Sequence, residues 1–242
     1  MMFKHFFVLI SAAFFAFFAI SAVTGQSGSS SREETSIEES YLQEAIELMI
    51  IRETSRSDSM DQKLIALERI GNAIERGSTN EELRTSLEYL ALEGTQNRIR
   101  QGGRAMNNFP TVRRQAVKYL GTLGTPEAKN ALIRVCLADN EPMVLQEAFK
   151  SLGDIGLNEN NEAASAIVWV ATKYNNSTAP DNLLALSALD TLEKLARKDK
   201  KIDSESVLFI AKISEGPYAL PVRERARQTL VNMWQYTGQT KE

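Results

Sequence analysis

The chain has 242 residues, of which 43% are apolar and 24% are charged, and its formal net charge is −3. This length can bury one sizeable core but does not indicate two domains, and the mild acidity argues against bulk nucleic-acid binding. Cys136 is the only cysteine, and the only histidine, His5, lies near the N-terminus. One cysteine and one histidine exclude an intramolecular disulfide and a His or Cys metal cluster, and loss of His5 with an N-terminal leader would also exclude Ser-His-Asp and Cys-His catalysis.

Residues 1–25 have the order of regions found in a secretory signal peptide. Lys4 precedes an apolar run from Phe6 to Val23, and small residues close the segment. We therefore predict cleavage after Ala22 or Gly25, a flexible polar segment over 26–35, and a periplasmic or secreted protein. The alternative is an uncleaved membrane anchor with the rest of the chain facing outside the cytoplasm, because the run has 18 residues and a spanning helix needs about 17 to 25.

Residues 36–238 show helical spacing of apolar residues, and no stretch alternates long enough to predict a strand, so the class is all-α. The pattern fits five helical hairpins. Their first helices are expected near residues 36–54, 79–93, 126–138, 160–174 and 203–213. Their second helices are expected near residues 60–76, 110–123, 142–155, 182–197 and 221–236.

Two of the second helices match each other at an offset of 32 residues. The matching residues are Pro110, Val112, Ala116, Leu120, Gly121 and Gly124 in one copy and Pro142, Val144, Ala148, Leu152, Gly153 and Gly156 in the other. Proline suits the first turn of a helix, Val, Ala and Leu form one buried stripe, and the last glycine can cap the helix in a left-handed conformation. A period of this size indicates stacked helical units.

The segment from Pro110 to Gly156 resembles the bacterial HEAT-repeat family, whose second helix typically reads Pro-x-Val-Arg followed by Ala and Leu-Gly. Weaker copies extend the pattern, with the corresponding alanines at Ala66, Ala116, Ala148, Ala188 and Ala226. The resemblance implies an α-solenoid of about five stacked hairpins, whose second helices line a concave side where partners bind.

The arginine of the family pattern is present as Arg113 and Arg223, but Leu145 and Ala185 take its place in the two units between. In the family this arginine commonly bonds across neighbouring repeats. We therefore expect a broken polar ladder here, with apolar packing holding the stack together.

An insertion over 94–109 separates the two helices of the second hairpin, and no acidic residue occurs from Gly94 to Pro126. The candidate partner-binding residues in this basic stretch are Arg98, Arg100, Arg104, Arg114 and Lys118. They could bind an acidic peptide, a phosphate-bearing polymer or a cell-wall anion, because arginine pairs well with carboxylate and phosphate. The alternative is a solvated loop whose arginines pair with the acid-rich segment 33–47.

The resemblance favours a non-catalytic exported scaffold that binds an acidic protein surface or peptide and serves a cell-envelope complex. The alternatives are a module for an anionic polymer or cell-wall ligand, a membrane-tethered spacer, and a HEAT-like lyase. We expect no catalytic residue, cofactor, metal or nucleic acid. Cys136 is expected to be a buried, inert thiol, and Trp169 and Trp234 to be either interface anchors or core residues.

Overall fold

The computed structural model describes residues 37–96, 98–175, 179–201 and 203–238. The predicted signal peptide and the polar segment over 26–35 lie outside these residues. The helices, in chain order, are α1 (Ile37–Arg56), α2 (Met60–Glu75), α3 (Glu81–Leu92), α4 (Pro110–Leu123), α5 (Pro126–Ala138), α6 (Pro142–Ile155), α7 (Glu162–Asn175), α8 (Asn182–Asp199), α9 (Ser204–Glu215) and α10 (Leu220–Gly238). A short 3-10 helix, η1 (Glu159–Asn161), precedes α7.

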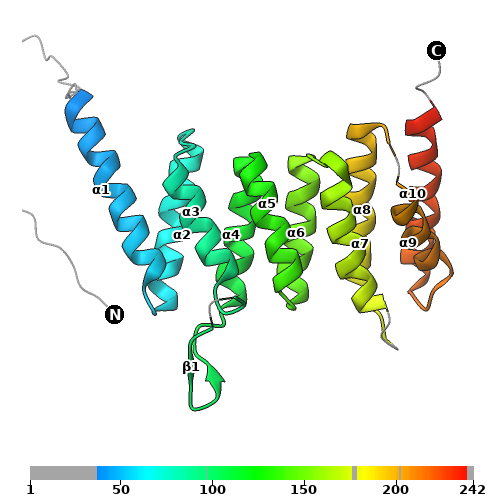
Figure 1. Ribbon diagram of the computed structural model, residues 1–242, viewed down its shortest axis with the longest axis horizontal. Helices are drawn as coiled ribbons and strands as arrows, with labels where there is room; N and C mark the ends of the chain where they lie inside the picture. Colours follow the sequence, from blue (N-terminus) through cyan, green and yellow to red (C-terminus); the bar gives the residue numbers. More distant parts are fainter. Residues whose placement is uncertain (1–36, 97, 176–178, 202, 239–242) are drawn as a thin grey trace, which may run out of the picture.

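The helices form two layers that run side by side from α1 to α10, with first helices in one layer and second helices in the other (Figure 1). Consecutive pairs form five antiparallel hairpins, and each hairpin packs on the next through both its first and its second helix. From α4 onward the second helices contact one another more extensively than the first helices do. The predicted all-α solenoid is therefore confirmed, and each helix begins and ends within a few residues of the expected position.

Local sequence signals explain where the repeated helices begin and end. Pro110 and Pro142 each occupy the first turn of their helix, where a missing backbone N–H removes no hydrogen bond. Gly124 and Gly156 follow the last turn with φ of 68° and 64°, the left-handed conformation that glycine adopts at low cost. The predicted caps are thus present in both copies.

The core is one continuous apolar cluster that passes through all five hairpins. The side chains of Val112, Ala116 and Leu120 in α4, and of Val144 and Ala148 in α6, are fully buried within it. No helix in the described part of the chain is long and apolar enough to cross a membrane.

The insertion folds into a small β-hairpin that projects from one edge of the row of helices (Figure 1). Strand β1 (Arg100–Gln101) pairs antiparallel with β2 (Arg104–Ala105). Gly102 and Gly103 form the two-residue turn between them, and both have positive φ. An insertion was predicted here but no strand, although a Gly-Gly pair is a known hairpin signal.

Candidate functional site

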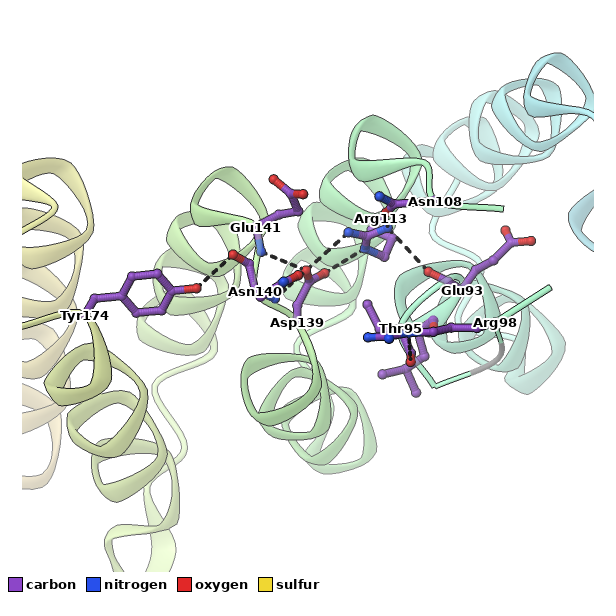
Figure 2. Close-up of polar contacts among 10 residues, drawn as sticks. Glu93, Thr95, Arg98, Asn108, Arg113, Asp139, Asn140, Glu141 and Tyr174 are labelled. Carbon is purple, nitrogen blue, oxygen red and sulfur yellow. Dashed lines mark hydrogen bonds and ion pairs between the residues drawn. The ribbon is translucent and has the colours of Figure 1, made fainter. Parts of the chain in front are cut away.

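Arg113 lies inside the stack, where its side chain is 1% exposed. Its Nε donates to Asp139 Oδ2 at 2.7 Å, its Nη2 donates to Asp139 Oδ1 at 3.2 Å, and its Nη1 donates to Asn108 Oδ1 at 2.8 Å (Figure 2). Asp139 caps the end of α5 and also accepts from the backbone N–H groups of Asn140 and Glu141. One buried ion pair therefore fixes the end of α5 and the start of α6 against α4.

Lys63 makes the equivalent contact one repeat earlier, at the place in α2 that Arg113 has in α4. Its Nζ lies 2.9 Å from Glu93 Oε2, and the side chains of Lys63 and Glu93 are 0% and 4% exposed. The two groups form an ion pair, but the angle between them does not meet the criterion for a hydrogen bond to this oxygen. The same Nζ donates to the backbone oxygen of Ser55 at 3.0 Å. Glu93 caps the end of α3, as Asp139 caps α5.

These ion pairs form a polar ladder at the first two junctions, while apolar packing continues through the whole stack. The ladder is broken at the next two junctions, as predicted, since Leu145 and Ala185 are buried apolar residues at the corresponding places. Lys63 was not predicted from the sequence, because the family pattern has an arginine at this place and the insertion lengthens the spacing between the corresponding alanines, Ala66 and Ala116, to 50 residues.

An open groove of about 620 Å³ crosses the layer of second helices from α4 to α10. Five basic side chains line it, namely Arg114, Lys150, Lys194, Arg197 and Arg225. Its two acidic lining residues are Glu147 and Asp190. An adjoining cleft of about 430 Å³ between α4 and α6 shares Arg114, Glu147 and Lys150 and adds Lys118. We call the two together the basic groove, which has six basic and two acidic lining residues.

Ion pairs across neighbouring helices hold several of these cations in place. Arg114 Nε lies 3.2 Å from Glu147 Oε2, and Arg225 lies 2.7 Å from Asp190 Oδ1 and 2.8 Å from Glu193 Oε2. Burial lowers the pKa of Arg225, but hydrogen bonds and the charges of Asp190 and Glu193 outweigh this effect and leave the pKa raised. Arg225 is therefore a permanent cation.

The structure divides the five predicted partner-binding residues between two places. Arg114 and Lys118 lie together in the basic groove. Arg98 lies at the base of the projecting hairpin, where its Nε donates to the backbone oxygen of Thr95 at 3.1 Å (Figure 2). Arg100 and Arg104 belong to the two strands, and none of the hairpin side chains that the structure describes lines the groove.

Lys150, Lys194, Arg197 and Arg225 line the groove but were missed from the sequence. Lys150 could have been found, because it lies 32 residues after Lys118 and shares its repeat position. Lys194, Arg197 and Arg225 have acidic residues close to them in the chain, so no basic stretch marks them. The packing of α8 on α6 and of α10 on α8 brings them beside Lys150.

Comparison with known families supports this architecture. Residues 104–176 match a model of HEAT repeats, from β2 through α7. The chain therefore contains HEAT repeats. HEAT repeats commonly mediate contacts between proteins and are typically non-catalytic, which makes this HEAT-repeat protein an interaction scaffold in general terms. No curated protein matches the chain.

The single cysteine and the two tryptophans of this HEAT-repeat protein differ in burial. Cys136 is buried, and burial raises the pKa of its thiol far above the ordinary value, which accords with an inert side chain. Trp169 and Trp234 are 58% and 68% exposed, so the alternative that placed them in the core is wrong. Within the described ranges no group of His, Cys, Asp and Glu is arranged to hold a metal ion.

Proposed function

We propose that this HEAT-repeat protein is a non-catalytic scaffold that binds another protein through the basic groove. The observation that carries the proposal is an open groove built from four successive second helices, on the face that the family resemblance makes the concave one. Neighbouring helix axes lie about 8–10 Å apart, so crossing four of them spans about 30 Å. An extended segment of about nine residues covers that distance.

We further propose that the protein works outside the cytoplasm, in the assembly or maintenance of a cell-envelope complex. The support is the signal-peptide pattern over residues 1–25. N-terminal sequencing of the protein from its own cells should find a start between Val23 and Ser27. Recovery of Met1 or Met2 on the exported protein would contradict cleavage and favour the anchored alternative.

The binding proposal is tested by photo-crosslinking in the source cells. A benzoyl-phenylalanine at Met143, which lines the groove and is 39% exposed, should give a discrete adduct with another protein. The matched control is Leu137 on α5, a first helix, where the side chain is 52% exposed. Adducts of equal yield at both positions, or at Leu137 alone, would show that the groove is not the binding surface.

A further inference from the structure

We infer that the natural occupant of the basic groove is an acidic polypeptide segment in extended conformation. This inference rests on the proposed function, because it names the partner chemistry of the same groove. Its starting point is a contrast in charge: six basic and two acidic residues line the groove, whereas the whole chain has a net charge of −3. A local excess of cations on an acidic protein attracts anionic partners.

The cations of the groove are accessible to a partner. The side chains of Arg114, Lys150 and Arg197 are 52%, 59% and 59% exposed, and that of Lys194 is 42% exposed. Glu147, in contrast, is only 10% exposed beneath Arg114 and Lys150. At α4 and α6 an incoming segment therefore meets basic groups above a largely covered carboxylate, whereas at α8 it meets Lys194 beside Asp154, which is 48% exposed.

The groove favours a polypeptide over a phosphate polymer because its cationic surface is interrupted. Asp190 is 55% exposed beside Arg225, and Met143 presents an apolar side chain between the cations of α4 and α8. A polymer with a charge on every unit would place phosphates against Asp190 and Met143. A polypeptide can instead alternate acidic side chains with apolar and neutral ones.

The repeat geometry also sets the spacing of the acidic residues. Lys118 and Lys150 occupy the same position in the neighbouring helices α4 and α6, which are in direct contact. With helix axes about 8–10 Å apart, an extended chain advances about three residues from one lysine to the next. The bound segment should therefore have an acidic residue at about every third position.

A display library of random ten-residue peptides, selected on the full protein, tests both the chemistry and the spacing. Selected peptides should be enriched in Asp and Glu at intervals of about three residues. The doubly reversed variant Lys118→Glu with Lys150→Glu should weaken their binding by about tenfold or more, since like charges now face the peptide. Both lysines are exposed, so the melting temperature of this variant should stay near that of the parent.

The matched control is Arg98→Glu with Arg100→Glu, which makes the same change in net charge on the projecting hairpin and should leave binding unchanged. A second variant, Gln146→Trp, fills the groove without changing its charge and should also abolish binding. Peptides blocked by Gln146→Trp but lacking acidic enrichment would overturn the inference while sparing the proposed function. Peptides unaffected by Gln146→Trp, or no selected peptide at all, would overturn both.

Two further probes address the other class of ligand. Inorganic polyphosphate and a single-stranded oligonucleotide are titrated against the same variants at low and high salt. Binding of either to the groove more tightly than the selected peptides would also overturn the inference.

Discussion

At the scale of single residues, Arg113 and Arg114 show how one step along a helix changes the role of an arginine. The side chain of Arg113 is 1% exposed and its guanidinium is bonded to a buried carboxylate, whereas that of Arg114 is 52% exposed in the groove. A buried ion pair costs much to desolvate, and removing one partner leaves the other as an uncompensated charge. The first arginine thus supports the stack, and the second is available to a partner.

This difference predicts unequal effects on stability. Arg113→Met should lower the free energy of unfolding by about 3–5 kcal/mol, because Asp139 remains buried and charged. Arg114→Met, the matched control, should lower it by less than about 1 kcal/mol. Urea denaturation of both variants checks the prediction, and equal shifts in the two midpoints would contradict it.

Tyr218 predicts a dependence of stability on alkaline pH. Its side chain is buried, and burial together with the charge of Asp181 raises the pKa of the phenol to about 12. The unfolded pKa is about 10, so the folded state binds the proton more tightly. The contribution of Tyr218 is fully present below about pH 10 and is lost as pH rises towards 12, by roughly 1–3 kcal/mol.

Tyr218→Phe removes this titration and also removes a buried hydroxyl that makes no hydrogen bond within the described structure. The variant should match or exceed the parent in stability at pH 8, and its advantage should grow towards pH 12. Denaturation curves at several pH values measure the difference between the two proteins. An advantage that stays constant with pH would show that Tyr218 does not titrate in this range.

At the scale of whole helices, glycine sets how closely successive second helices approach. A Cβ added at Gly121 of α4 would lie 2.6 Å from Ser151 Oγ and 2.7 Å from Ser151 Cβ on α6. Gly71 faces Tyr119 and Gly153 faces Thr191 at the corresponding places. At the last junction the buried Glu193 of α8 occupies the place of the glycine and accepts a hydrogen bond from Thr229 of α10. A polar contact therefore joins these two helices where the earlier pairs have a glycine.

A double-mutant cycle tests this close contact. In an open helix, Gly→Ala would stabilise by up to about 1 kcal/mol. Gly121→Ala should instead destabilise by about 1–3 kcal/mol, because α6 must move away from α4. Combining it with Ser151→Gly removes the two nearest atoms, so the penalty of Gly121→Ala should shrink by at least about 1 kcal/mol. Strict additivity of the two changes would refute the contact.

At the scale of the whole molecule, sequence periodicity predicts the stack of hairpins but not the surface that it creates. Pro110 and Gly124 mark the two ends of α4 through their own backbone preferences, and the apolar spacing between them indicates a helix. The bounds of this helix therefore follow from local sequence alone. The basic groove depends on Lys150, Lys194 and Arg225, which come from three helices and lie close only after stacking. The pairing of Lys63 with Glu93 is hidden for the same reason, because its two partners belong to different hairpins.

The projecting β-hairpin supplies the last prediction, because the stack should be independent of it. Residues around its tip are exposed, and its ordered contacts lie at its base, where Asn107 Oδ1 accepts from the backbone N–H of Ile99 and Asn108 binds Arg113. Replacing residues 100–105 with a short Gly-Ser-Gly connection keeps Ile99, Asn107 and Asn108 in place. Loop-closure entropy changes slowly with loop length, so the free energy of unfolding should change by less than about 1 kcal/mol.

The shortened protein should also keep full affinity for peptides selected on the parent, since the groove is lined by helix residues and by no hairpin side chain within the described part of the chain. Calorimetry measures the first quantity, and fluorescence anisotropy with a labelled peptide measures the second. Unchanged melting with lost binding would instead place the partner site at the strand residues Arg100 and Arg104. Loss of the folding transition itself would show instead that the hairpin is part of the cooperative core, because the α3–α4 junction then needs it to form.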